Sequence, residues 1–238
     1  VVYVTFVVAY WFFRAIKFVI GIYIGVQRME KSLQTDWVKK IEELKDPRTE
    51  KLRYIYLCPV YGEDYDLLDS SFRDWAKNDI GAEKIDVVMA IEEKKSEMQV
   101  ENFKKLKEKY GEKFGSMQYY IHPFGIPGEI VGVKGANINY AAREYVKKLE
   151  KEGKDLSNYL LITCDSDLRP HEKYLSAVTY QYLTVENPMH TFFTSAVHTF
   201  NNNIWSVPPL VRVFSSTTTL AVLYTWVFER SVKSIFTK

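Results

Sequence analysis

Short apolar runs alternate with amphipathic stretches along most of this chain, and the alternation limits the folds that it can adopt. Four runs have the length and composition of buried strands: YIYLCPV from Tyr54, IDVVMAI from Ile85, MQYYIHP from Met117 and YLLITCD from Tyr159. They are continuously apolar, as strands covered on both faces are. The pattern therefore predicts an α/β domain with a mostly parallel sheet covered by helices, in which YLLITCD is a central strand.

The stretches between these runs have helical periodicity. Helices are expected at about 67–77, 97–109, 138–150 and 172–185. A further apolar run follows at 191–200, and the charged segment around Pro47 is interpreted as a linker. We therefore divide the chain into an N-terminal helical segment with its linker, 1–48, and a globular domain, 49–238.

The composition excludes some classes of protein. Of 238 residues, 47% are hydrophobic and 26% are charged, which is typical of a chain that folds around a hydrophobic core. The formal net charge is only +2, so the chain as a whole has no field that attracts nucleic acid, and no nucleic-acid partner is expected. Two cysteines, Cys58 and Cys164, are too few for a disulfide framework and favour a reducing, cytosolic environment. The four histidines are scattered, and we assign none of them to a metal.

The N-terminus is apolar enough to enter a membrane. From Val1 to Val26 only Arg14 and Lys17 are charged, and they interrupt the run before the ~20 residues that a spanning helix needs. We therefore predict the end of a membrane helix near Phe13, followed by an amphipathic helix at the membrane interface. A buried helix of a soluble domain is the alternative. In the interfacial helix, four basic residues would face the lipid headgroups: Arg14, Lys17, Arg28 and Lys31.

Basic residues are also frequent just after the apolar run: Arg28, Lys31, Lys39 and Lys40. Positive charge beside a membrane segment is typical of its cytoplasmic side. The sequence thus predicts a protein of the cell membrane whose globular domain lies on the cytoplasmic side.

Two acids follow the last of the four strand-like runs. Asp165 and Asp167 are separated by one residue, so in an extended segment both carboxylates would point to the same side. Ligands of parallel sheets bind beyond the carboxyl ends of the strands. A divalent cation would compensate the repulsion between the two carboxylates, and magnesium is commonly held by one or two carboxylates and substrate phosphates. The alternative is a solvated turn, with Asp167 near the N-cap of the following helix.

A glycine-rich segment with a lysine, GEIVGVKGANINYA, precedes the third expected helix. Gly132 and Gly135 allow a close backbone approach, while Lys134, Asn137 and Asn139 supply charge and amides near a helix N-terminus, which suits an anion. The spacing is not that of the phosphate-binding loop of nucleoside triphosphatases. A plain loop with helix capping is the alternative.

A third polar group follows the first strand-like run. In PVYGED, the ring of Tyr61 could cover a base, and the carboxylate of Glu63 could accept hydrogen bonds from it, with Pro59 beside them. A turn without a ligand is the alternative.

Taken in order, CPVYGED, the acids after IDVVMAI, GVKGANINYA and LLITCDSD resemble the cytosolic domain of membrane-bound family 2 glycosyltransferases. The resemblance covers about Lys51 to Phe200. It implies the nucleotide-binding GT-A fold, with an aspartate-x-aspartate motif at Asp165 and Asp167.

The resemblance also implies roles for single residues. Asp165 and Asp167 would hold Mg²⁺ or Mn²⁺, with Asp165 also contacting the nucleotide. An acid after the second strand would contact the nucleoside, and either Glu92 or Glu93 can be that residue. The nucleotide-binding residues that the resemblance implies are Pro59, Tyr61, Glu63, Glu92, Lys134, Asn137 and Asp165.

The chain departs from the family pattern in its second half. The family's acceptor-side base and the glutamine-x-x-arginine-tryptophan motif of processive members are not found before Lys238. Glu229 is the only acid after Glu186, and its neighbours suggest a helix. We therefore expect the donor-binding part of a longer protein, with the base beyond Lys238 and the acceptor part incomplete.

The resulting expectation is a membrane-associated glycosyltransferase of the hexosyltransferase class. It would transfer a sugar from a nucleotide sugar, typically a UDP-sugar, to a polysaccharide or lipid acceptor, with inversion and with a divalent metal ion. Two alternatives remain open. A nucleotidyltransferase would make the sugar nucleotide instead, although it normally carries a basic, glycine-rich loop where this chain has the acidic PVYGEDYD. A non-catalytic module would bind nucleotide without turnover.

Overall fold

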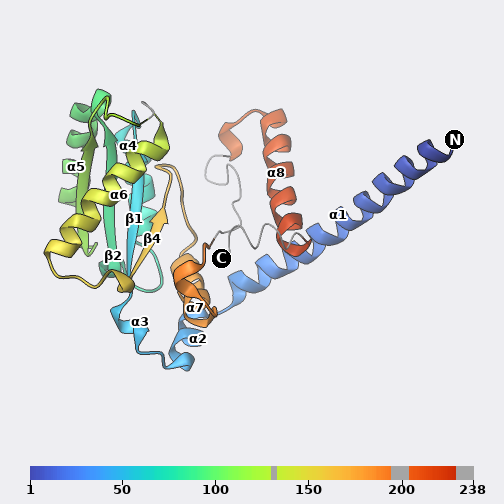
Figure 1. Cartoon of the computed structure of the whole chain (residues 1–238), viewed down its shortest axis with the longest axis horizontal. Coiled ribbons are helices and arrows are strands. Elements are labelled where there is room, and N and C mark those ends of the chain that lie inside the picture. The colour runs from blue at the N-terminus through green and yellow to red at the C-terminus, as the bar shows by residue number, and fades with distance from the viewer. Residues whose placement is uncertain (130–132, 194–203, 229–238) are drawn as a thin grey trace. The chain divides into compact units, whose positions relative to one another are not determined.

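The fold was obtained as a computed structural model of the whole chain (Figure 1), which describes residues 1–129, 133–193 and 204–228. The chain separates into two compact units. One contains 37–179, and the other contains 1–36 together with 180–238. The first division therefore falls at residue 36, earlier than the expected linker around Pro47, and a second division falls within the expected globular domain.

The helices and strands of the described residues are as follows: α1 (Val2–Gln34), α2 (Trp37–Leu44), α3 (Arg48–Lys51), β1 (Arg53–Val60), α4 (Tyr65–Trp75), β2 (Ile85–Glu92), α5 (Ser96–Tyr110), β3 (Ser116–His122), α6 (Lys134–Lys151), β4 (Tyr159–Thr163), α7 (Tyr174–Thr184) and α8 (Pro209–Phe228). Short 3₁₀ turns occur at Ala82–Lys84, Glu93–Lys95, Leu156–Asn158, Pro188–His190 and Ile204–Ser206.

The unit 37–179 is built on a four-stranded sheet. Its strand order is β3-β2-β1-β4, and every neighbouring pair is parallel. The four predicted strands are confirmed, with ends that differ by no more than two residues from the apolar runs. An α/β fold with a parallel, helix-covered sheet is therefore established for this unit.

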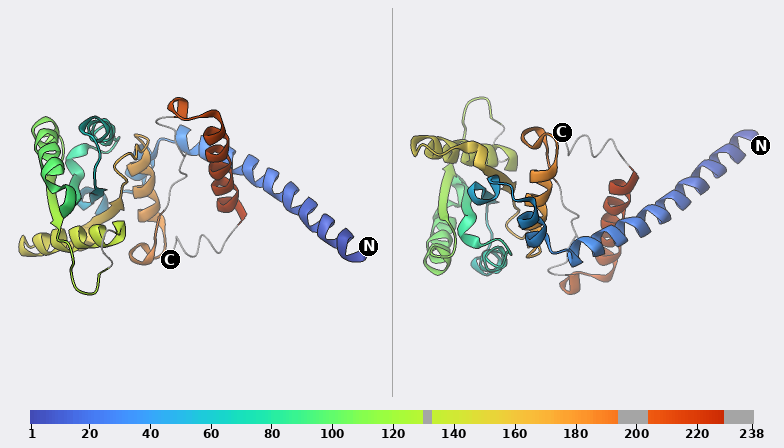
Figure 2. Two further views of the ribbon diagram at one scale, coloured as in Figure 1. Left: turned by 90° about the horizontal axis from the view of Figure 1, so that it is seen from above. Right: turned by 90° about the horizontal axis from the view of Figure 1, so that it is seen from below.

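Helices cover both faces of the sheet, and this explains why the strands are apolar throughout. On one face, α6 places Ala141, Tyr145 and Leu149 against alternate residues of β1 and β2, such as Ile55 and Val88. On the other face, α4 contributes Trp75, whose ring meets that of Tyr56 edge to face at 5.5 Å. Figure 2 shows α6 on one side of the sheet and α4 and α5 on the other. Successive residues of a strand point to opposite faces, so almost every residue of β1 and β2 is buried under a helix.

The expectation that YLLITCD is a central strand was wrong for the described residues. β4 pairs only with β1 there and lies at the edge of the sheet. Leu161 is 54% exposed as a result. The run expected to follow, 191–200, forms no strand over 191–193, and the rest of it lies outside the described residues.

The N-terminal helix is one continuous element, so the predicted break near Phe13 was wrong. α1 runs from Val2 to Gln34 without interruption. No proline occurs in this stretch, and a charged side chain on the surface of a helix does not end it. The helix is long and apolar enough to cross a membrane, a property that membrane anchors share with signal sequences and with core helices of soluble proteins. Only 6% of its most apolar 18 residues are buried, which argues against the core helix.

Two glycines bring α1 close to α8. A Cβ atom at Gly25 would lie 2.9 Å from the backbone oxygen of Leu223, and one at Gly21 would lie 2.9 Å from the ring of Phe228. These distances are too short for a real Cβ atom. The contact between the two helices therefore depends on the absence of side chains at these positions, which are the only buried residues of α1.

The two cysteines are expected to be unreactive in the folded protein. Both are fully buried. Burial raises the pKa of Cys58 well above its usual value, and burial together with the Asp165 carboxylate raises the pKa of Cys164 to about 12. Labelling with a thiol reagent such as DTNB at pH 8 should therefore require denaturant, while an exposed cysteine introduced by Glu112→Cys should react at once.

The same burial makes the stability depend on pH. Unfolded thiols ionise near pH ~8.5, whereas the buried ones stay neutral, so unfolding releases protons above that pH. The contribution of the two thiols is intact below pH ~8.5 and is lost as the pH rises further, and denaturant titrations at pH 8 and pH 10 should show a lower free energy of unfolding at pH 10. Rapid labelling of the native thiols would contradict this account.

Candidate functional site

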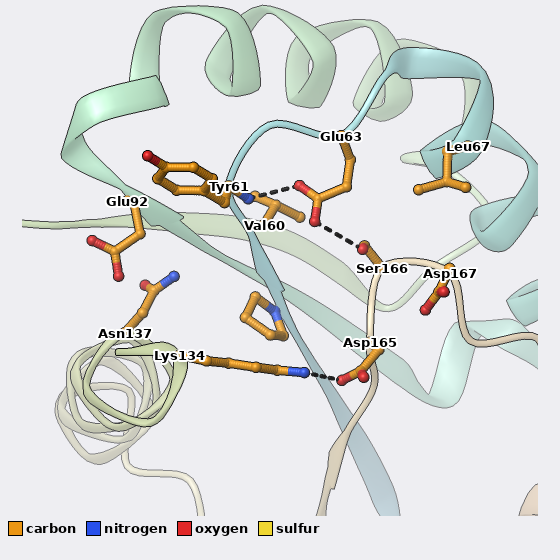
Figure 3. A pocket seen from close by; sticks show the side chains of 11 residues that line it. Val60, Tyr61, Glu63, Leu67, Glu92, Lys134, Asn137, Asp165, Ser166 and Asp167 are labelled. Carbon is orange, nitrogen blue, oxygen red and sulfur yellow. Dashed lines mark hydrogen bonds and ion pairs between the residues drawn. The ribbon is translucent and has the colours of Figure 1, made fainter. Parts of the chain in front are cut away.

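One pocket lies at the carboxyl-terminal edge of the sheet, where the ends of the parallel strands meet (Figure 3). It has a volume of about 460 Å³. Its walls come from the end of β1 and the turn after it, the end of β2, the first turn of α6, and the segment after β4. The lining residues are Pro59, Val60, Tyr61, Glu63, Leu67, Glu92, Lys134, Asn137, Asp165, Ser166 and Asp167. All eight residues to which the sequence analysis assigned nucleotide or metal binding are among them.

Glu63 holds the turn after β1 in shape. Its Oε2 atom accepts hydrogen bonds from the backbone N–H groups of Tyr61 at 2.6 Å and Gly62 at 3.0 Å. Its Oε1 atom accepts from the hydroxyl of Ser166 at 3.0 Å. The carboxylate expected to face a base therefore also links the end of β1 to the segment after β4.

The backbone of the same turn is anchored from α5. The Glu63 carbonyl accepts hydrogen bonds from the side-chain amides of Gln99 at 3.0 Å and Asn102 at 3.3 Å. Gln99 and Asn102 are buried. A buried amide needs a partner, so these contacts fix the position of the turn against the helix.

Asp165 and Asp167 lie in a tight turn, not in the extended segment from which the sequence argument started. The N–H of Leu168 donates to the carbonyl of Asp165 at 2.9 Å and closes the turn. Both carboxylates nevertheless line the pocket. The alternative role of Asp167 at a helix N-cap was wrong, because α7 does not begin until Tyr174.

Lys134 is the first residue of α6 and forms an ion pair with Asp165 across the pocket (Figure 3). Their side chains are 53% and 61% exposed, respectively. An exposed ion pair contributes only ~0–1 kcal/mol, because water already solvates both charges well. A ligand that offers Lys134 a phosphate and Asp165 a cation can therefore replace the pair at little cost.

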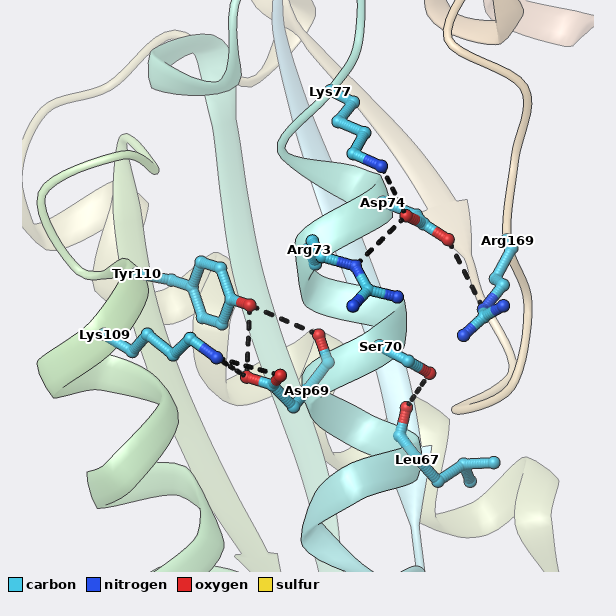
Figure 4. Close-up of polar contacts among 9 residues, drawn as sticks. All are labelled: Leu67, Asp69, Ser70, Arg73, Asp74, Lys77, Lys109, Tyr110 and Arg169. Carbon is cyan, nitrogen blue, oxygen red and sulfur yellow. Dashed lines mark hydrogen bonds and ion pairs between the residues drawn. The ribbon is translucent and has the colours of Figure 1, made fainter.

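The segment after β4 is braced by one face of α4. Ser71 donates from its hydroxyl to the Ser166 carbonyl at 2.7 Å, and Trp75 donates from its ring N–H to the Leu168 carbonyl at 2.9 Å. Next to them, Asp74 pairs with Arg169 at 3.4 Å (Figure 4). The three contacts fix the backbone that carries the two aspartates.

The opposite side of α4 is tied to α5. Asp69 accepts hydrogen bonds from Lys109 at 2.7 Å and from the Tyr110 hydroxyl at 3.1 Å (Figure 4). Burial acts to raise the pKa of Asp69, but these hydrogen bonds outweigh it, so the pKa lies below its usual value. The carboxylate stays ionised, and α4 is held between α5 and the aspartate turn.

Asn137 is a buried amide whose side-chain oxygen lacks a hydrogen bond. Its Nδ2 donates to the carbonyl of Ala90 at 2.9 Å, while Oδ1 is buried without a hydrogen-bond partner. Of the other residues singled out in this segment, Asn139 is exposed and outside the pocket, a Cβ atom at Gly135 would meet open space, and Gly132 lies outside the described residues.

Of the two candidate acids after β2, Glu92 lines the pocket and Glu93 does not. Glu92 is the last residue of β2 and lines the pocket. Glu93 turns away from the pocket lining and accepts a hydrogen bond from the backbone N–H of Phe124 at 2.7 Å. Glu92 is therefore the acid available to a ligand.

The charges of the pocket suit a metal ion that arrives with its ligand. Four carboxylates line it against one lysine, and an anionic ligand would be repelled without a cation. No cluster of three metal-ligating side chains occurs within the residues that the structure describes. Asp165 and Asp167 can supply one or two carboxylate ligands, and magnesium or manganese would need further oxygens from phosphate and water.

The sequence analysis did not predict that Ser166 donates a hydrogen bond to Glu63, or that Glu63 holds the turn after β1. Sequence periodicity gives no signal for this contact, because Glu63 and Ser166 are 103 positions apart. Glu229, the one acid near the C-terminus, lies outside the described residues, as does everything after it.

Comparisons with known proteins add no assignment. The chain matches no protein-family model, and a search of characterised protein sequences found no significant match. The argument for function therefore rests on the fold and the pocket.

Removal of the Glu63 carboxylate should loosen the turn after β1. In Glu63→Ala, the amides of Tyr61 and Gly62 lose their acceptor, and their hydrogen exchange, followed by NMR, should become about tenfold faster, as expected for a loss of about 1.4 kcal/mol. The matched control is Glu108→Ala, which removes an exposed glutamate from α5. Equal exchange rates in both variants would show that Glu63 does not hold the turn.

Proposed function

We propose that this chain is the donor-binding part of a membrane-associated glycosyltransferase related to family 2, with a GT-A type domain. It binds a nucleotide sugar, typically a UDP-sugar, together with Mg²⁺ or Mn²⁺. A hydroxyl group of a polysaccharide or lipid acceptor gives its proton to a base and attacks the anomeric carbon with inversion, the bond from that carbon to the diphosphate breaks, and UDP leaves.

The observation that carries the proposal is the convergence of four separated segments on one pocket. The turn after β1, the end of β2, the start of α6 and the segment after β4 together line it, and each contributes residues that the family resemblance implies. Ligands of open parallel sheets bind at this edge. A volume of about 460 Å³ falls in the range of small-molecule sites.

One end of the pocket suits a diphosphate. Lys134 supplies a positive charge at the N-terminus of α6, where backbone N–H groups are also available to an anion. Asp165 and Asp167 would hold the divalent cation beside it. When bound, the metal ion would neutralise the charge that develops on the departing diphosphate.

The other end of the pocket suits a nucleoside. Tyr61 is 53% exposed and presents an aromatic ring at the rim, next to Pro59. Glu92 and the unpartnered Oδ1 of Asn137 are hydrogen-bond acceptors. A base or ribose would supply the donor that Oδ1 of Asn137 lacks.

α1 supports the membrane part of the proposal. An exposed apolar helix of 33 residues has a strong reason to enter a lipid bilayer, because leaving it in water is unfavourable. The basic residues that follow favour a pocket-bearing domain on the cytoplasmic side, where nucleotide sugars are made and where the buried thiols stay reduced.

Substitution of the aspartates should weaken donor binding. In Asp165→Asn and Asp167→Asn, the metal ligands lose their charge while their shape is kept, so the Kd for UDP with Mn²⁺, measured by calorimetry on the full chain in detergent, should rise at least about tenfold. Glu112→Gln, an exposed acid at the opposite edge of the sheet, is the control and should bind like the wild type. Unchanged affinity in both aspartate variants would refute the proposal.

Metal and nucleotide should bind together and not separately. Because the described residues hold no cluster of three ligands for a resident ion, replacing Mn²⁺ by EDTA should weaken UDP binding at least about tenfold, and UDP should strengthen Mn²⁺ binding by the same factor. Release of UDP from UDP-hexoses would then identify transfer or hydrolysis. Pyrophosphate release from UTP and a sugar phosphate would identify a nucleotidyltransferase instead.

A further inference from the structure

A buried histidine lies between two glutamates beside the pocket, and the proposed function does not use it. His122 is the last residue of β3 and is 4% exposed. Its Nε2 atom lies 2.8 Å from Oε2 of Glu129, and its Nδ1 atom lies 3.6 Å from Oε1 of Glu92. Glu92 is the register partner of His122 in the pairing of β2 with β3. The imidazole therefore bridges a pocket acid and an acid of the loop after β3.

The hydrogen bonds of this group are incomplete on the side of the pocket. A carboxylate can only accept, so the contact with Glu129 assigns a hydrogen to Nε2 of His122. In the neutral ring, Nδ1 is then an acceptor that faces another acceptor, Oε1 of Glu92. Both atoms are buried and have no hydrogen-bond partner. One hydrogen between Nδ1 and Oε1 would satisfy both.

The ring is held in place from several elements. Tyr140 of α6 packs against it, with ring centroids 5.2 Å apart. Glu129 is itself fixed by a turn in which its N–H donates to the carbonyl of Ile126 at 3.1 Å. Gly128 before it has a φ of 86°, which an ordinary side chain rarely allows. The ring can therefore act as a rigid support for the Glu92 carboxylate.

Glu92 has two oxygens with different surroundings. Oε1 is buried at the His122 ring, which leaves Oε2 as the atom that can accept from a ligand. Without the His122 ring, the Glu92 side chain would be free to rotate. Ligand binding would then have to order the Glu92 carboxylate. That reorganisation lowers affinity.

We propose that His122 is a positioning residue, which presents the carboxylate of Glu92 to the nucleoside part of the donor, with Glu129 fixing the ring. This role rests on the proposed function, because it needs a nucleotide in the pocket. It affects the nucleoside end alone. At the diphosphate end, Lys134 pairs with Asp165 instead.

Two amide substitutions separate the contacts of the ring. Asn places its amide where Nδ1 of histidine lies, and Gln places its amide near Nε2. His122→Asn therefore keeps a partner for Glu92, whereas His122→Gln keeps only the contact with Glu129. The Kd for UDP in the presence of Mn²⁺ should rise about tenfold in His122→Gln and less than about threefold in His122→Asn, since only His122→Gln leaves the Glu92 carboxylate without the polar group beside it.

Inorganic pyrophosphate with Mn²⁺ is the probe for the diphosphate end. Its Kd should be the same in the wild type and in both histidine variants. A purely structural role of His122 would weaken UDP and pyrophosphate together, and that result would overturn the proposal, as would an unchanged Kd for UDP in His122→Gln. His171→Gln, at an exposed histidine, is the matched control.

A second variant keeps the test decisive if the histidine variants do not fold. Glu129→Gln retains an acceptor but removes the charge that fixes the ring, so the Kd for UDP should rise about threefold with pyrophosphate binding unchanged. Its control is Glu150→Gln, at an exposed position of α6. If Glu129→Gln also binds UDP like the wild type, the positioning role fails. If the wild-type chain binds neither UDP nor pyrophosphate, the proposed function fails first.

Discussion

The parallel pairing of β1 with both β2 and β4 is the constraint on which the rest of this unit depends. Parallel strands end at the same edge of the sheet. Residues that are more than 100 positions apart in the sequence therefore meet at this edge. The connection between neighbouring ends is then made by side chains. Glu63 joins the end of β1 to the segment after β4, and Asn137 joins α6 to the end of β2.

α4 and α5 convert this edge into a defined site. Helices in such a fold are usually described as cover for the sheet, yet α4 also donates two hydrogen bonds to the backbone that carries the aspartates. α5 does the same for the turn after β1. Hydrogen bonds from α4 and α5 thus hold the walls of the pocket in place. The pocket lining itself presents acceptors and charged groups to a ligand.

Most of the fold could be predicted from the sequence, because the strands are continuously apolar and the helices are amphipathic. The residues that line the pocket could be predicted for a related reason, since polar groups directly after buried parallel strands lie at the carboxyl-terminal edge of the sheet. The decision between Glu92 and Glu93, the turn at Asp165 and the hydrogen bond from Ser166 to Glu63 depend on local geometry and distant contacts, which periodicity does not encode. The continuity of α1 was not predicted, because Arg14 and Lys17 were interpreted as the end of a membrane helix. Charged side chains on the surface of a helix do not end it.

The edge position of β4 has a consequence for how this domain can be handled. In the part of the chain that is described, the outer side of β4 has no strand partner, and Leu161 is exposed beside it. Unpaired backbone groups next to an apolar side chain are a template for adding another strand. A fragment cut to 37–179 would therefore carry an exposed edge strand, which favours self-association.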